Sequence, residues 1–154
     1  MATLKAGDKA PGFSLTDPAG KTVKLADFKG RKLLIYFYPK ADTPGCTVQA
    51  CSIRDAAAEL RSAGIDAVGV SPDQEKAQGK FDEKYGLGFP LLSDPDHKAA
   101  KAYGAWGAKS MYGKKYMGII RSSFLVGADG RLLGAWYKVK PEATVPNALQ
   151  AAEG

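Results

Sequence analysis

Short apolar segments divide the chain into strands and helices. Phe13–Leu15 and Thr22–Leu25 alternate apolar and polar residues, and the turn-forming residues Asp17–Gly20 between them predict an N-terminal β-hairpin. The continuous apolar run Leu33–Tyr38 is typical of a central strand that is covered on both faces. Ile65–Val70 predicts a second buried strand of the same kind.

Between these two buried strands the apolar residues recur with a helical period. The predicted helix runs from Pro44 to about Ser62 and ends near Gly64. Its apolar stripe contains Val48, Cys51, Ile53, Ala57 and Leu60. A strand–helix–strand unit of this kind predicts that the two strands pair in parallel.

The second half of the chain continues the mixed pattern. Helices are predicted at about Asp73–Tyr85 and Asp96–Tyr103 and from about Thr144, a short strand at Phe89–Leu92, and a loop rich in Gly and Lys over Trp106–Gly118. Strands at Ile119–Val126 and Leu132–Val139 flank an Asp-Gly pair that is typical of a hairpin. We therefore predict an α/β, thioredoxin-like fold in which residues 1–154 form one domain, with a mixed central sheet and helices on both faces.

Composition narrows the possible functions. The 154 residues are enough for one domain with its own core, and no apolar run approaches the ~20 residues of a bilayer span. The start, Met1–Asp8, lacks the apolar segment of a secretory signal, so we expect a cytoplasmic protein without a membrane partner. The net charge is +6, but the basic residues are scattered and form no nucleic-acid motif, so no nucleic-acid partner is expected.

Structural zinc is excluded by the count of cysteine and histidine ligands. Two cysteines and one histidine cannot build a Cys₄, Cys₂His₂ or His₃ zinc site, and no cofactor motif is present. The histidine, His97, begins a predicted helix beside Asp94 and Asp96, where a surface or capping role is the simplest interpretation. Any chemistry therefore depends on very few nucleophiles.

The first cysteine lies where the central strand gives way to the first long helix, at the edge where open α/β sheets bind ligands. Thr43 suits the N-cap and Pro44 suits the first helical position. Cys46 then falls in the first turn. Unpaired backbone N–H groups and the positive end of the helix dipole favour the reactive thiolate there.

The second cysteine follows five residues later. On a continuous helix this spacing separates the two Cα atoms by roughly 8–9 Å, beyond the ~7 Å limit for a disulfide. Either Cys46 and Cys51 never bond, or the first turns of the helix unwind to let them bond. If they never bond, Cys51 serves as a small buried apolar residue. The spacing and an expected reducing compartment both argue against a structural disulfide.

These residues also carry a family resemblance. Pro39-x-x-x-Thr43-x-x-Cys46 resembles the active-site motif of the peroxiredoxins, and the string from Tyr36 to Cys51 is similar to their bacterioferritin comigratory protein, or peroxiredoxin Q, branch. The similarity covers nearly the whole chain and includes Lys5-Ala6-Gly7-Asp8, Ala10-Pro11, Leu91-Leu92-Ser93-Asp94, Asp96-His97 and Arg121-x-Ser123-Phe124-Leu125.

The resemblance implies an antioxidant thiol peroxidase that acts on hydrogen peroxide and organic hydroperoxides. Cys46 would be the peroxidatic residue and would become a sulfenic acid. Arg121 would stabilise the developing negative charge, although its strand alone also allows an outward-facing, solvated side chain. Thr43 would hold the peroxide as well as cap the helix, and Pro39 would shield the thiolate from water.

The resemblance further implies how the sulfenic acid is resolved. Cys51 would form an intramolecular disulfide with Cys46, which thioredoxin or a similar dithiol would reduce. In other members of the branch the resolving cysteine lies on a later helix or is missing. Pro44 and Gly45 would contact the substrate, and a monomer is expected because no second subunit is needed.

Two other classes of function remain to be compared. A thiol–disulfide oxidoreductase of this fold would use Cys-x-x-Cys, whereas this chain has Cys-x₄-Cys. A basic, non-enzymatic module that binds nucleic acid is the third possibility. Trp106 and Tyr112 either line the pocket or a docking surface, or they only pack, and Trp136 and Tyr137 are interpreted as core and rim.

Overall fold

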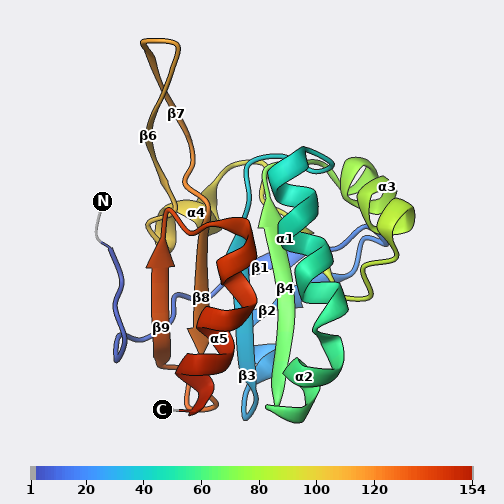
Figure 1. The fold of residues 1–154 in the computed structure, drawn as a ribbon, viewed down its shortest axis with the longest axis vertical. Helices are drawn as coiled ribbons and strands as arrows, with labels where there is room; N and C mark the ends of the chain where they lie inside the picture. The colour runs from blue at the N-terminus through green and yellow to red at the C-terminus, as the bar shows by residue number, and fades with distance from the viewer. Residues whose placement is uncertain (1–2, 154) are drawn as a thin grey trace.

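The computed structural model describes residues 3–153, so Met1, Ala2 and Gly154 of the predicted domain lie outside the described residues. Its main sheet has seven strands with helices on both faces, as predicted (Figure 1). The spatial order is β2 (Thr22–Lys24), β1 (Ser14–Thr16), β5 (Leu91–Ser93), β4 (Ile65–Ser71), β3 (Lys32–Phe37), β8 (Ser122–Val126) and β9 (Leu132–Tyr137).

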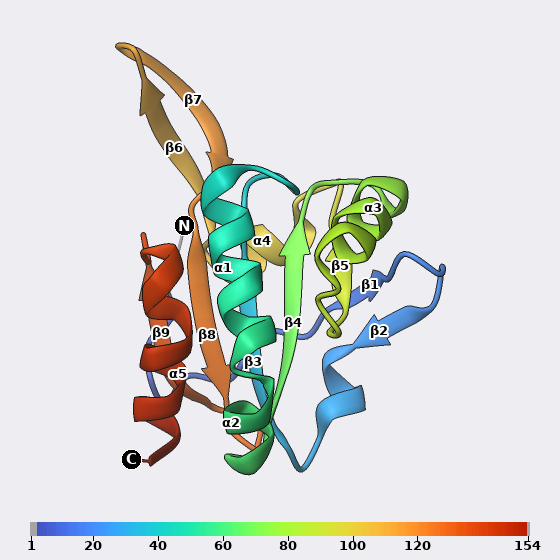
Figure 2. The ribbon, with the colours of Figure 1, turned by 45° about the vertical axis from the view of Figure 1, so that its right-hand side comes forward.

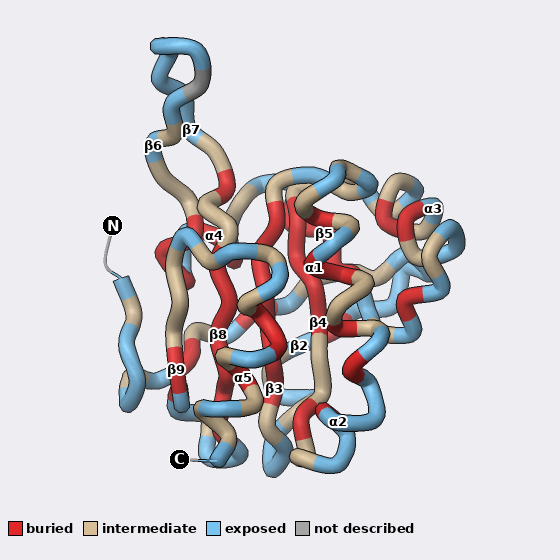
Figure 3. Tube along the Cα trace, in the orientation of Figure 1, coloured by how far each residue is buried: buried red, intermediate tan, exposed pale blue. Residues whose placement is uncertain are grey.

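Strand β3 lies near the centre of this sheet and alternates its side chains between two cores. Leu33, Ile35 and Phe37 face one apolar cluster, whereas Leu34, Tyr36 and, directly after the strand, Tyr38 face the other. All six side chains are fully buried, which explains the unbroken apolar run in the sequence (Figure 3). β3 pairs in parallel with β4 and antiparallel with β8, so the predicted parallel pair is confirmed.

The helices cover the sheet unequally. One face carries α1 (Pro44–Asp55), α2 (Ala57–Ser62) and α5 (Thr144–Glu153), and the other carries α4 (Lys98–Ala102). α3 (Glu75–Tyr85) contributes Phe81 to the core that contains Leu34, Tyr36 and Tyr38. Short 3₁₀ turns, η1 (Leu25–Phe28) and η2 (Pro141–Ala143), follow β2 and precede α5.

The predicted helix from Pro44 to Ser62 is wrong in two respects. It is interrupted at Ala56, within a run of alanines that has no helix-breaking residue, so local propensity does not set the break. Its buried face also differs, because Val48 is 51% exposed while Gln49 is fully buried. The helix therefore presents a polar amide, together with Cys46, to the core.

Both predicted hairpins are confirmed, and a third one was not foreseen. β1–β2 and β8–β9 pair antiparallel across the expected turns. The segment predicted as a loop, Trp106–Gly118, instead forms β6 (Trp106–Met111) and β7 (Lys114–Ile119), which belong to no other sheet. Figure 2 shows this ribbon projecting beyond the end of the main sheet, near the start of α1.

The strand predicted at Ile119–Val126 is wrong at its start, because residues 119–121 do not belong to β8. Ile119 ends β7, and β8 begins only at Ser122, so Arg121 lies in the short connection between the two strands. Its backbone remains fixed, because Val139 donates its N–H to the Arg121 carbonyl at 3.0 Å.

Candidate active site

The site is built where β3 ends and α1 begins. Thr43 occupies the N-cap position, with extended backbone dihedrals, and its carbonyl accepts the first helical bond from Thr47 at 2.8 Å. The expected cap by its side chain is wrong, because the Thr43 hydroxyl donates to the Lys40 carbonyl at 2.9 Å. That bond uses the hydroxyl proton and leaves its oxygen able to accept a bond from another group.

The loop before Thr43 is anchored to the next strand and helix. Asp73, just after β4, accepts the backbone N–H of Ala41 at 2.7 Å. Asp42, whose φ is +60°, accepts bonds from Lys84 and from the Tyr85 hydroxyl, each at 3.0 Å. These hydrogen bonds, that from Lys84 first, lower the pKa of Asp42 below its ordinary value. α3 thus holds the loop that leads into the first turn of α1.

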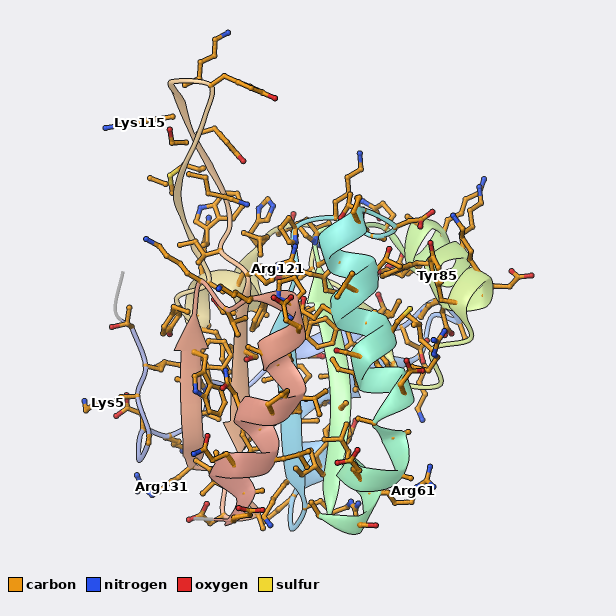
Figure 4. The ribbon with its side chains drawn as sticks, viewed as in Figure 1. Lys5, Arg61, Tyr85, Lys115, Arg121 and Arg131 are labelled. Atoms are coloured by element: carbon orange, nitrogen blue, oxygen red, sulfur yellow. The ribbon has the colours of Figure 1, made fainter. Side chains whose placement is uncertain are left out.

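Cys46 lies in this first turn and is only 1% exposed. Its sulfur packs in the core that contains Tyr36 and Tyr38. Arg121 donates a hydrogen bond from Nη2 to Sγ of Cys46 at 3.4 Å, so the structure brings together two of the residues singled out in the sequence. Figure 4 shows Arg121 between the base of the β6–β7 ribbon and the upper ends of α1 and α5.

A buried amide holds the guanidinium in place. Arg121 donates from Nη1 to Oε1 of Gln49 at 2.8 Å, and Gln49 donates from Nε2 to Oγ1 of Thr144 at 2.8 Å. Gln49 and Thr144 are both fully buried. Because a guanidinium only donates, the amide oxygen must face Arg121, and the NH₂ group is left for Thr144.

These two polar residues were missed in the sequence. Gln49 carried a usable signal, since it follows Cys46 by three residues and so shares a helix face with it. Thr144 carried none, because it lies 95 residues away from Gln49 along the chain.

Gly45 is packed against Arg121. A Cβ at this position would lie 3.0 Å from Arg121 Nη2 and 3.7 Å from Cγ of Pro141. The absent side chain therefore lets the guanidinium approach the first turn of α1. Pro44 is exposed at the first helical position, and Pro39 is half-buried just after β3. The substrate contacts expected for Pro44 and Gly45, and the shielding expected of Pro39, remain predictions.

Comparison with known proteins decides the family. The model of the AhpC/TSA family matches residues 6–134, which include Cys46, Cys51 and Arg121. The chain belongs to the AhpC/TSA family and is a peroxiredoxin of the Bcp branch. It is similar to peroxiredoxin Bcp of Escherichia coli K12, with 54% identity over 132 residues that cover 86% of this chain and 85% of the relative.

Solved structures agree with this peroxiredoxin in fold. A mutant of Xylella fastidiosa PrxQ has a TM-score of 0.91 at 29% identity, covering 99% of this chain and 98% of the other. The Xanthomonas campestris bacterioferritin comigratory protein, studied for its alkyl peroxide reduction activity, has a TM-score of 0.85 at 37% identity, covering 92% and 90%. The thioredoxin-like fold is thereby confirmed, and family membership makes the chain a thiol peroxidase.

The second cysteine lies on the same helix as the first. Cys51 is half-buried and follows Cys46 within the continuous helix α1. Both cysteines are free thiols in this structure. On this intact helix the two cysteines are five residues apart, a spacing that does not allow a disulfide between them.

His97 and Tyr112 make none of the hydrogen bonds found at this site among residues 3–153. His97 is at the N-cap of α4, without a side-chain capping bond, and stacks on Trp106 with ring centroids 4.0 Å apart. Tyr112 is 98% exposed at the tip of the β6–β7 ribbon, so it does not line the pocket. Within residues 3–153, no cluster of three or more potential metal ligands is found. None of the helices in that range is long and apolar enough to cross a membrane.

Proposed function

We propose that this peroxiredoxin reduces hydrogen peroxide and organic hydroperoxides through Cys46, with Cys51 as the resolving residue. The observation that carries the proposal is the 3.4 Å hydrogen bond from Arg121 to the Cys46 sulfur in the first turn of α1. A permanent positive charge and a helix N-terminus then both act on one nearly buried sulfur. Both groups present positive charge to the atoms that carry negative charge during attack on a peroxide.

The first step transfers one oxygen to sulfur. The Cys46 thiolate attacks one peroxide oxygen, the O–O bond breaks, and its electron pair leaves on the other oxygen. That oxygen takes up the proton released when the thiol ionised and departs as water or an alcohol. The Arg121 guanidinium stabilises the leaving negative charge. The free lone pairs of the Thr43 hydroxyl accept the peroxide O–H, since the hydroxyl proton is already bonded to the Lys40 carbonyl.

The second step forms a disulfide. The Cys51 thiol attacks the sulfur of the Cys46 sulfenic acid, a sulfur–sulfur bond forms, and the hydroxyl leaves with the Cys51 proton as water. Because both residues lie on the continuous helix α1, this step requires the turns between them to unwind first.

The third step restores the thiols. A reductant of the thioredoxin type attacks the disulfide with one thiolate to form a mixed disulfide, and its second thiol then displaces the peroxiredoxin thiol. Two electrons and two protons pass to the peroxiredoxin, and the reductant leaves as a disulfide. A reducing compartment such as the cytoplasm suits this cycle. Because both cysteines belong to one chain, we infer that one domain, residues 1–154, completes it as a monomer.

Burial favours a peroxide over a protein as the oxidant. Cys46 is 1% exposed, so a disulfide on another protein cannot reach its sulfur in the folded state. A peroxide group is far smaller. The alkyl peroxide reduction described for the Xanthomonas campestris relative supports the same choice.

The test compares wild type with Cys46→Ser and Cys51→Ser in a stopped-flow peroxide assay with recycling by thioredoxin. We expect no reaction from Cys46→Ser. Cys51→Ser should consume one equivalent of peroxide and then recycle poorly. Peroxide consumption by Cys46→Ser at the wild-type rate would refute the proposal, and full recycling by Cys51→Ser would refute the resolving role.

A further inference from the structure

The tip of the β6–β7 ribbon exposes large aromatic side chains to solvent. Tyr112 is 98% exposed at its tip, and Tyr116, which follows Lys115 in the chain, is 41% exposed. We define the hairpin surface as Lys109, Tyr112, Lys114, Lys115 and Tyr116. Figure 4 shows the side chain of Lys115 directed away from the body of the protein. Among residues 3–153 the ribbon pairs with no other strand, and residues 112–117 at and next to its tip are all exposed.

The charge on this ribbon has one sign. Residues 106–119 contain three lysines and no Asp or Glu. Lys138 and Lys140 are also exposed, and they flank Val139, whose N–H binds the Arg121 carbonyl. The basic residues that are scattered in the sequence are therefore partly collected at the end of the molecule that holds Cys46.

The base of the ribbon is coupled directly to the active site. Ile120, which joins β7 to Arg121, donates its N–H to Ala105 at 2.7 Å, and a Cβ at Gly107 would collide with the Ile120 side chain. The pKa of Lys109 lies below its ordinary value, first because of burial and then because of the positive charge of Arg121. Cys46 has a smaller, opposite effect on this pKa. Lys109 thus lies within the electrostatic reach of both active-site residues.

We propose that the hairpin surface docks an acidic face of the protein dithiol that reduces the Cys46–Cys51 disulfide. This inference rests on the proposed function, which requires such a protein to reach the start of α1. An acidic face complements the one-sided charge of the ribbon and would speed the encounter. The exposed tyrosines supply the rigid contact area that interfaces favour.

Other occupants fit less well. A second copy would bring the same basic surface against itself, on a chain whose net charge is already +6. A nucleic-acid binder that makes about 6–10 phosphate contacts needs more cations than the three lysines of the ribbon. Neither alternative explains why the basic ribbon lies beside Cys46.

The test uses the variant Lys114→Glu/Lys115→Glu, which changes the tip of the ribbon away from Cys46. The matched control is Lys21→Glu/Lys29→Glu, two exposed lysines outside the ribbon, so both variants lower the net charge from +6 to +2. Each protein is assayed with a bacterial thioredoxin regenerated by its reductase and NADPH, and separately with dithiothreitol.

We expect kcat/KM for thioredoxin to fall about tenfold or more in the ribbon variant and to change little in the control. Turnover with dithiothreitol should stay at the wild-type level in both. The wild-type value should also fall between about 50 and 200 mM salt, and more steeply than that of the ribbon variant.

Equal losses in the ribbon variant and the control would overturn the inference, as would unchanged kinetics with thioredoxin. A parallel loss with dithiothreitol would assign the ribbon a structural role instead. Retardation of single-stranded DNA by wild type but not by the ribbon variant, with thioredoxin kinetics unchanged, would assign the surface to nucleic acid. Failure of the proposed function itself would appear separately, as absent wild-type turnover with dithiothreitol.

Discussion

Replacing Thr144 by valine removes one acceptor from the buried network that positions Arg121. Valine has nearly the shape of threonine, so the packing at the start of α5 is preserved. What is lost is the 2.8 Å bond that Gln49 Nε2 donates to the Thr144 hydroxyl. Gln49 is fully buried, so its NH₂ group then has one hydrogen-bond partner fewer and no direct access to water.

The free-energy penalty of the unpaired Gln49 amide applies only while α1 is folded. A buried donor left without its partner destabilises the folded protein by about 1–3 kcal/mol. Gln49 lies between Cys46 and Cys51, so unwinding that joins the two cysteines exposes its amide to water and removes the penalty. The unwinding equilibrium should therefore shift by about 5- to 140-fold towards the unwound form.

Two measurements follow from this reasoning. After oxidation with one equivalent of peroxide, rapid alkylation and mass spectrometry should show the Cys46–Cys51 disulfide forming at least about fivefold faster in Thr144→Val. The same variant should accumulate less sulfinic acid at high peroxide, because the sulfenic acid is removed sooner. Its Tm should fall by about 2–12 °C.

Thr144→Ser is the control, since it keeps the hydroxyl and should resolve at close to the wild-type rate. A disulfide that forms no faster in Thr144→Val, in a variant whose Tm does fall, would refute the reasoning. That combination would mean that the Gln49–Thr144 bond stabilises the fold but survives the conformational change of α1.

Three further predictions concern the surroundings of the sulfur. Gly45→Ala should slow Cys46 oxidation about tenfold in stopped-flow assays without lowering Tm, because the new Cβ crowds the guanidinium while alanine favours the helix by about 1 kcal/mol. Tyr36→Phe should keep or raise the free energy of urea unfolding, since the buried Tyr36 hydroxyl has no partner among the described residues. Tyr38→Phe should instead lower that free energy by about 1–3 kcal/mol, because it breaks the buried hydrogen bond to Gln78. The pKa of Asp42 should lie below about 3.9 in an NMR titration and rise in Lys84→Met. Because folding lowers this pKa, the ionised Asp42 carboxylate stabilises the folded protein above pH ~3.9. This stabilisation is lost as the pH falls through the lower pKa of the folded state.

The sequence predicted the sheet well where burial alone decides the pattern. Leu33–Tyr38 is apolar at every position because β3 is covered on both faces, and that signal is local. The sequence did not predict the β6–β7 hairpin, and the reason is equally local. Tyr112 and Gly113 both have positive φ, as in the tight hairpin turns usually formed by Asn-Gly or Asp-Gly, and tyrosine is an unusual first residue there.

The residues of the candidate site also fall into two groups, those that a local sequence pattern predicts and those that depend on tertiary packing. Cys46 and Thr43 could be placed because they belong to one short motif at a helix start. The pairing of Gln49 with Thr144 could not, since it depends on how α5 packs against α1. The inward face of α1 was likewise misjudged, because hydrophobicity favoured Val48 over Gln49 as the buried residue. A buried polar side chain is recognised only once its partner is known.

The position of Gln49 also sets two requirements of the catalytic cycle against each other. Its amide oxygen holds Arg121 at the sulfur that must react with peroxide, and its NH₂ group ties the same turn of α1 to α5. Stronger bonds at Gln49 should therefore favour rapid oxidation of Cys46 but delay the unwinding that brings Cys51 to it. A resolving cysteine on another helix would not require Gln49 itself to leave its partners. In this chain, sensitivity to over-oxidation should consequently follow the strength of one buried hydrogen-bonded network.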